Sequence, residues 1–190
     1  MELILMRHAA TAGNLLRRYI GTTDEPLSPE GRAAAGAAAG KLPRVGLCFV
    51  SPLLRCRETA KICFPEAVQI VLPDLRETDF GLFENKSYED LKDVPEYVRW
   101  LESNGTLPFP GGESREAADA RALRALDFVR DYKKSPAAVV AHGGTIMAIM
   151  AARGEPRRDY YDWQLPNCGS LRVSVEGRRL RLLPEAAADA

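Results

Sequence analysis

Three short apolar runs constrain the fold of this chain more than any other feature. They lie at residues 3–6, 47–50 and 138–141, and none of them alternates between apolar and polar residues. A strand can be apolar throughout only when both faces of its sheet are covered, as in parallel α/β sheets. A weaker run lies at residues 68–72. The pattern predicts an α/β fold, a three-layer α/β/α arrangement with a mostly parallel central sheet.

Helical patterns lie between these runs. Ser28-Pro29-Glu30 places an N-cap residue, a proline and an acid at the start of an alanine-rich helix that we expect to end near Lys41. Further helices are predicted over residues 53–62 and 114–133. The stretch from Gly36 to Leu42 resembles a nucleotide-binding P-loop, but it is one residue too short and lacks the Ser or Thr that holds magnesium. We interpret it as helix whose small residues pack on the sheet.

The segment 78–112 interrupts the alternation of strands and helices. It mixes prolines, glycines and asparagines with aromatic and charged residues, which predicts short helices and loops. We therefore expect one domain over residues 1–190, with an insertion at about 78–112 that covers the active site at one end of the sheet. Residues 170–175 and 179–183 predict a hairpin, and residues 184–190 a frayed tail.

Composition argues against several classes of partner. Lys and Arg total 26, as do Asp and Glu, so no excess of positive charge favours nucleic acid or an anionic membrane. The four cysteines form no Cys-x-x-Cys pair, and Glu2 stands where a signal peptide needs a basic residue. The most apolar later stretch, 137–152, is too short to span a bilayer. We expect a cytoplasmic protein with a small-molecule partner and leave its oligomeric state open.

The chain has two histidines, and each directly follows a predicted strand. His8 comes after the first apolar run and His142 after the third. Open α/β sheets bind ligands at the carboxyl ends of their strands, so these positions favour function over two structural histidines. Arg7 precedes His8, and Arg55 follows the second run. If the strands are neighbours, two guanidinium groups and two imidazoles meet in a pocket suited to phosphate.

Six segments and a late asparagine carry a family pattern. They are Arg7-His8-Ala9-Ala10-Thr11-Ala12-Gly13-Asn14, Tyr19 to Gly31, Ser51 to Thr59, Leu75 to Glu84, Gly111-Gly112-Glu113-Ser114, Val140-Ala141-His142-Gly143-Gly144 and Asn167. In this order, and over nearly the whole chain, they resemble the histidine phosphatase family, the phosphoglycerate mutase-like superfamily. The resemblance is strongest to its α-ribazole phosphatase branch and implies a phosphoglycerate mutase-like fold.

The resemblance implies a phosphomonoesterase that works through a phosphohistidine, with no metal or cofactor. His8 would be the nucleophile, which suits an imidazole with an unperturbed pKa of about 6.5. Glu77 would protonate the leaving oxygen and later deprotonate water, with Asp79 and Glu84 as competing candidates for this acid. The other implied contacts to the phosphoryl group or substrate are Arg7, Arg55, His142, Thr11, Asn14, Gly21 and Gly143.

Two positions depart from the family pattern. Ala9 replaces the usual glycine after the Arg-His pair, which adds a methyl group near the phosphate site and argues against a positive φ there. Phe83-Glu84-Asn85 stands where many relatives have tryptophan, glutamate and glycine. The loop after the acid is therefore expected to differ in shape.

Several functions remain open. The resemblance suggests α-ribazole 5'-phosphate from cobalamin biosynthesis as substrate, but relatives hydrolyse sugar phosphates, phosphoglycerate or many esters. A mutase is the enzymatic alternative, and it is disfavoured because residues 104–110 carry no charge where mutases of the family have an Arg- and Lys-rich insertion. A zinc hydrolase is disfavoured because the sequence lacks the ligand motif of such a site. A catalytically silent regulatory or scaffold protein is the alternative from another class, but it need not keep both histidines, both arginines and the acid.

Overall fold

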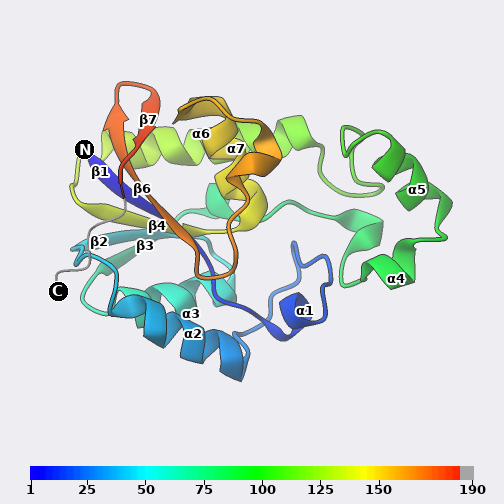
Figure 1. Ribbon diagram of the computed structural model, residues 1–190, viewed down its shortest axis with the longest axis horizontal. Coiled ribbons are helices and arrows are strands. Elements are labelled where there is room, and N and C mark those ends of the chain that lie inside the picture. The colour runs from blue at the N-terminus through cyan, green and yellow to red at the C-terminus, as the bar shows by residue number, and fades with distance from the viewer. Residues whose placement is uncertain (185–190) are drawn as a thin grey trace.

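A mixed seven-stranded sheet forms the centre of the protein, as a computed structural model that describes residues 1–184 shows (Figure 1). The strand order is β3-β2-β4-β1-β6-β7-β5. The strands are β1 (Glu2–Arg7), β2 (Leu47–Val50), β3 (Val68–Val71), β4 (Ala137–Ala141), β5 (Gly154–Glu155), β6 (Ser170–Glu176) and β7 (Arg179–Leu182). The first four predicted strands pair in parallel, and β6 is antiparallel to β1 and β7. The predicted tail lies outside the described residues after Pro184.

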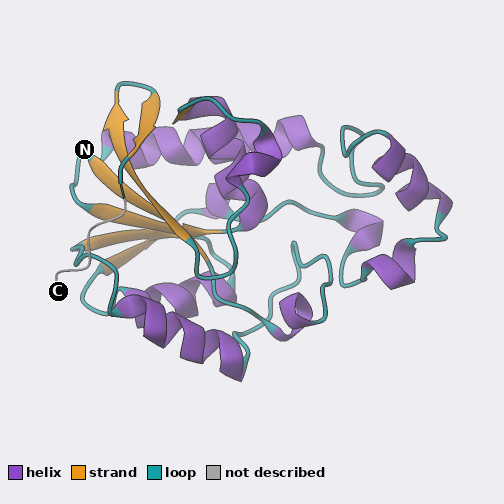
Figure 2. Ribbon diagram, viewed as in Figure 1, coloured by secondary structure: helices purple, strands orange, loops and turns teal. Residues whose placement is uncertain are grey.

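Helices cover both faces of this sheet, so the predicted three-layer α/β/α fold is confirmed (Figures 1 and 2). On one face lie α2 (Pro29–Ala39) and α3 (Leu54–Cys63), and on the other α6 (Arg115–Asp131) and α7 (Gly143–Arg153). The short helices α1 (Ala12–Leu15), α4 (Tyr88–Leu91) and α5 (Pro95–Glu102) lie beyond the carboxyl ends of the parallel strands. Three 3-10 turns complete the described helices: η1 (Pro73–Leu75), η2 (Gly81–Phe83) and η3 (Tyr160–Trp163).

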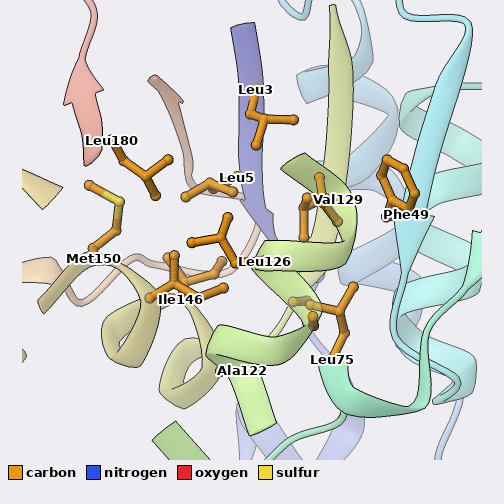
Figure 3. Packing of buried hydrophobic residues seen from close by; sticks show 14 of the residues in the cluster. Leu3, Leu5, Phe49, Leu75, Ala122, Leu126, Val129, Ile146, Met150 and Leu180 are labelled. Atoms are coloured by element: carbon orange, nitrogen blue, oxygen red, sulfur yellow. The ribbon is translucent and has the colours of Figure 1, made fainter. Parts of the chain in front are cut away.

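Successive residues of the central strands belong to two separate cores. In β1, Leu3 and Leu5 join the core under α6 and α7, whereas Ile4 and Met6 join the core under α2 and α3. All four are fully buried, because side chains of a strand alternate between the faces of its sheet. Figure 3 shows the first core, with Leu126 of α6 among its members. Burial on both faces explains why these strands are apolar without alternation.

The helix α2 corrects one detail of the sequence interpretation. Ser28 caps it as predicted, accepting a hydrogen bond from the Gly31 N–H at 2.9 Å. Gly31 and Ala35, one turn apart, are the buried small residues. Gly36 has open space around it, so the prediction that this glycine packs on the sheet is wrong. The helical period explains the difference, since residue 36 lies about 100° around the helix from residue 35.

The segment 78–112 contains η2, α4, α5 and turns, in agreement with the predicted short helices and loops. Buried Phe83, Leu91 and Tyr97 form its own small core. Its two ends are in contact at Gly81, where a Cβ atom would clash with the backbone of Pro110 and Gly112. Gly81 also has a φ of +52°, which favours glycine. Within residues 1–184, no helix is long and apolar enough to cross a membrane.

Candidate active site

The strand order brings the two histidines together. The His8 N–H donates to the Ala141 carbonyl at 3.0 Å, and the Ser51 N–H donates to the Val140 carbonyl at 3.1 Å. The ends of β1, β4 and β2 therefore lie side by side at one edge of the sheet. The rings of His8 and His142 are 5.1 Å apart and meet edge to face.

His8 is held in one tautomer by a backbone contact. Its Nδ1 lies 2.7 Å from the Ala9 carbonyl oxygen. A carbonyl can only accept, so this hydrogen bond places the ring proton on Nδ1 and leaves the lone pair on Nε2. Burial lowers the pKa of His8 well below its ordinary value, and the charge of Arg55 adds to this effect. The ring is therefore neutral at neutral pH, and Ala9 makes this contact without a positive φ.

Arg7 and Arg55 form the cationic part of the site. Arg55 is fully buried and donates to three carbonyls of the loop 20–23 at 2.7 to 3.2 Å, while Arg7 donates to the Leu165 carbonyl at 2.6 Å. The Nε donors of both arginines are buried and have no hydrogen-bond partner within residues 1–184. In the same described part of the chain, Trp100 and Trp163 have buried unpaired Nε1 atoms as well, so an unpaired donor is not specific to this site. At two positively charged groups beside His8, however, such donors suit an anion with acceptor oxygens.

Glu84 organises the loop that Arg55 binds. Its carboxylate accepts hydrogen bonds from the N–H groups of Gly21, Thr22 and Phe80 and from the Thr23 hydroxyl, at 2.8 to 3.2 Å. Arg55 binds carbonyls of the same loop, so the two side chains together hold its backbone. This structural use of Glu84 was not predicted, because three of the four donors come from residues distant from it in the sequence.

Gly21, an expected substrate contact, and Asp79, a competing candidate for the acid, both make hydrogen bonds within the protein. The Gly21 N–H is bonded to Glu84 and the Gly21 carbonyl to Arg55, so both backbone groups have protein partners. A side chain at Gly21 would collide with the Thr78 carbonyl. Asp79, a competing acid, accepts from the Gly81 N–H at 2.9 Å. The part of Gly21 in substrate binding stays a prediction.

Glu77 lies against the start of α7 and is only 7% exposed. Its carboxyl group accepts the Thr78 N–H at 2.9 Å and the Gly144 N–H at 3.1 Å. A Cβ atom at Gly144 would be 2.5 Å from Glu77 Oε1, so a larger residue there would displace the Glu77 carboxyl group. Burial raises the pKa of Glu77 above its ordinary value, although the hydrogen bonds and nearby arginines oppose it. A raised pKa suits a carboxyl group that must donate a proton.

His142 is the N-cap of α7 and is fully buried. Its Nε2 lies 2.7 Å from the Ser51 hydroxyl and 3.4 Å from the Cys56 sulfur. Burial lowers the pKa of His142 well below its ordinary value, and Arg55 contributes. Gly143 is the first residue of α7, where backbone N–H groups favour an anion. Ser51 was not predicted as a site residue, although it directly follows the strand β2.

The loop after His8 adds an amide group. Thr11 and Asn14 form a reciprocal cap on α1, in which each backbone N–H bonds the other's side-chain oxygen at 3.2 Å. Asn14 Oδ1 also accepts from Asn167 Nδ2 at 3.3 Å, and this second amide donates to the His8 carbonyl at 3.0 Å. These contacts use the oxygen of Asn14, and its NH2 group makes no hydrogen bond within residues 1–184. Thr11 is buried and shapes the loop.

Three of the four cysteines are buried in the core under α2 and α3. Cys48, Cys56 and Cys63 are free and buried, and burial raises the pKa of the Cys48 and Cys63 thiols to about 12. Among residues 1–184, no three His, Cys, Asp or Glu side chains form a group that could hold a metal ion.

Comparisons with known proteins show which proteins this chain resembles. The family model of the histidine phosphatase superfamily (branch 1) matches residues 3–185. A relative from Hydrogenobacter thermophilus, provisionally named a phosphoserine phosphatase, is 30% identical and covers 96% of this chain and 93% of its own. A phosphoglycerate mutase structure from Thermus thermophilus is 35% identical, with full coverage of both chains and a TM-score of 0.75. An alpha-ribazole phosphatase from Shigella flexneri is 24% identical, covers 96% of this chain and 95% of its own, and has a TM-score of 0.84, which shows a shared fold.

The two buried histidines predict a pH-dependent stability. Both folded-state pKa values lie below 6.5, so the unfolded chain binds more protons as pH falls through 6.5, and the free energy of unfolding decreases. Each histidine contributes at most about 1.4 kcal/mol per pH unit in this window. Urea unfolding of the wild type and of His142→Gln between pH 7 and pH 5, in phosphate-free buffer, should show a shallower slope in the variant. Equal slopes would contradict the buried neutral state of His142.

Proposed function

The chain belongs to the histidine phosphatase superfamily, and on this premise we propose that it is a phosphomonoesterase that forms a phosphohistidine at His8. One observation carries the proposal. The lone pair of His8 Nε2 is free, and it lies in a site with two buried arginine Nε donors that lack a protein acceptor within residues 1–184. A phosphoryl group combines an electrophilic phosphorus with several acceptor oxygens, so it matches both features.

In the first step, His8 Nε2 attacks phosphorus and the bond from phosphorus to the ester oxygen breaks. Glu77 gives its proton to that leaving oxygen. Arg7, Arg55 and His142 stabilise the charge on the remaining phosphoryl oxygens. The His8 ring becomes positively charged when Nε2 is phosphorylated, and the bond from Nδ1–H to the Ala9 carbonyl stabilises that charge.

In the second step, water attacks the phosphohistidine. Glu77, now a carboxylate, accepts a proton from this water, and the bond from phosphorus to Nε2 breaks. The electron pair returns to Nε2, so His8 is again neutral and inorganic phosphate leaves. Glu77 thus needs both protonation states in one turnover, which a raised pKa makes accessible near neutral pH.

The covalent intermediate gives the first prediction of this proposal. Mixing the protein with an aryl phosphate in chelator and quenching in alkali, where phosphohistidine survives, should yield a protein with one added phosphoryl group on His8. The variant His8→Ala should lose this mass and at least about a thousandfold in turnover, because the nucleophile is gone. A sample without ester is the control. An unlabelled wild type with full activity, or an active His8→Ala, would overturn the proposal and favour another mechanism.

The role of Glu77 gives a second prediction. Glu77→Gln should slow hydrolysis of alkyl phosphates by about 10²- to 10⁴-fold, because a poor leaving oxygen needs the proton, and should slow phosphorylation by a nitrophenyl phosphate much less. The rates of phosphohistidine formation with the two esters measure this difference. Asp79→Asn is the matched control for the competing acid, and it should show no such selectivity. A loss of equal size on both esters would remove Glu77 from the acid role.

We infer that the substrate is a small phosphate ester, with α-ribazole 5'-phosphate of cobalamin biosynthesis as one candidate. The names of the relatives differ, since they include a phosphoserine phosphatase, a phosphoglycerate mutase and an alpha-ribazole phosphatase. Broad hydrolysis of sugar phosphates is the second candidate. Mutase activity is the third, and the likeness to the Thermus thermophilus mutase favours it, while the uncharged residues 104–110 favour hydrolysis. The free cysteines support a cytoplasmic location.

A panel of phosphate esters decides among these substrates. We expect the enzyme to convert 3-phosphoglycerate to glycerate and inorganic phosphate and not to 2-phosphoglycerate, because the proposed second step transfers the phosphoryl group to water. A kcat/KM for α-ribazole phosphate about a hundredfold above the other esters would identify that substrate. Similar values across the panel would identify a broad phosphatase, and formation of 2-phosphoglycerate would identify a mutase.

A further inference from the structure

Arg121 of α6 is a buried arginine for which the proposed mechanism has no use. Its side chain is 3% exposed and forms a two-pronged ion pair with Glu113, at 3.1 Å from Nε and 2.7 Å from one terminal nitrogen. The remaining donors bind the carbonyls of Asp74 at 3.0 Å, Arg76 at 2.6 Å and Glu77 at 3.4 Å. All five N–H donors of the guanidinium group therefore have protein partners, so Arg121 is not available to a ligand.

These partners lie on the backbone that carries the proposed acid. The three carbonyls belong to residues 74–77, which lead from η1 to Glu77. A hydroxyl from α7 supports the same stretch, since Thr145 donates to the Arg76 carbonyl at 3.0 Å. The carboxyl group of Glu77 is held only by N–H groups of Thr78 and Gly144 within residues 1–184. The position of that carboxyl group therefore depends on how firmly its own backbone is held.

Arg121 also joins the two ends of the segment 78–112. Glu77 directly precedes this segment and Glu113 directly follows it, and the same terminal nitrogen of Arg121 binds both. The Glu113 N–H donates to the Asp79 carbonyl at 2.9 Å, which closes the junction. Burial alone would raise the pKa of Glu113, but Arg121 lowers it overall, so the pair is charged.

Stability alone does not explain a buried ion pair of this kind. Apolar residues of similar volume often stabilise a protein as well or better, because charges lose hydration when they are buried. An apolar side chain cannot, however, direct five hydrogen bonds to three carbonyls and a carboxylate. What the arginine supplies here is a fixed backbone geometry at the residue that must reach the leaving oxygen.

We propose that Arg121 is a positioning residue for Glu77, which sets the place of the acid by holding residues 74–77 and Glu113 together. This inference rests on the proposed phosphatase function. It predicts that a disturbed Arg121 impairs proton donation to the leaving group more than binding or attack at phosphorus. If the Arg121 contacts served folding alone, their loss would slow the reactions of esters with good and with poor leaving groups equally.

The test compares Arg121→Lys with the wild type on an alkyl phosphate and a nitrophenyl phosphate. Lysine keeps the positive charge but lacks the planar guanidinium group that makes the two-pronged contact with Glu113. We expect phosphohistidine formation to fall about 10- to 100-fold with the alkyl ester, since a small misplacement of a catalytic group has this effect, and less than about threefold with the nitrophenyl ester. Arg124→Lys, one turn along α6 in an exposed pair with Asp74, is the matched control and should leave both rates unchanged.

A double variant links the effect to the acid. In a Glu77→Gln background, Arg121→Lys should cause no additional loss that is selective for the alkyl ester, because the proton donor is already absent. Equal losses on both esters, or selective losses that multiply in the double variant, would overturn the proposal. If Arg121→Lys does not fold, as judged by circular dichroism, Glu113→Gln replaces it, with the same selective loss expected and the same contradiction if the losses are equal. A wild type without phosphohistidine would instead overturn the proposed function itself.

Discussion

The parallel pairing of β1 and β2 with β4 is the constraint on which the rest of the structure depends. Its register aligns Arg7 of β1 with Ala141 of β4, so both strands end at the same level of the sheet. Helices cover both faces, which makes the strands apolar and confines reactive side chains to their ends. His8, Ser51 and His142 each follow one of these strands directly. A change in register would separate them.

The candidate site contains buried charge. Arg55 is fully buried and uses three hydrogen bonds to hold the loop 20–23, which Glu84 also holds through its carboxyl group. These contacts hold the guanidinium group of Arg55 in place but do not involve its Nε donor. Like the Nε of Arg7, this donor has no hydrogen-bond partner within residues 1–184. A buried donor without an acceptor costs free energy, and an anion bound at these two arginines would recover part of that cost.

The environments of the two histidines and of Glu77 separate their proposed roles. Both rings are buried and neutral, but the Nδ1 of His8 is held by a carbonyl oxygen, whereas the Nε2 of His142 meets the Ser51 hydroxyl. Only the first contact dictates which nitrogen carries the proton. Glu77 is also buried, and for a carboxyl group burial raises the pKa and favours the protonated form. Burial therefore favours the uncharged form of both the proposed nucleophile, His8, and the proposed acid, Glu77.

The sequence by itself determined the layers, most element boundaries within a few residues, and the histidines and arginines at the strand ends. These features are local, because apolar runs, capping residues and neighbours such as Arg7 and His8 can be read along the chain. Only the tertiary structure decided that Glu84 organises the loop under Arg55, that Ser51 meets His142, and that Arg121 binds the backbone of Glu77. Each of these contacts joins residues far apart in the sequence, and their distances depend on how the strands pair and on how loops and helices pack against the sheet. Gly36 shows the same limit, since composition alone could not tell which side of α2 faces the core.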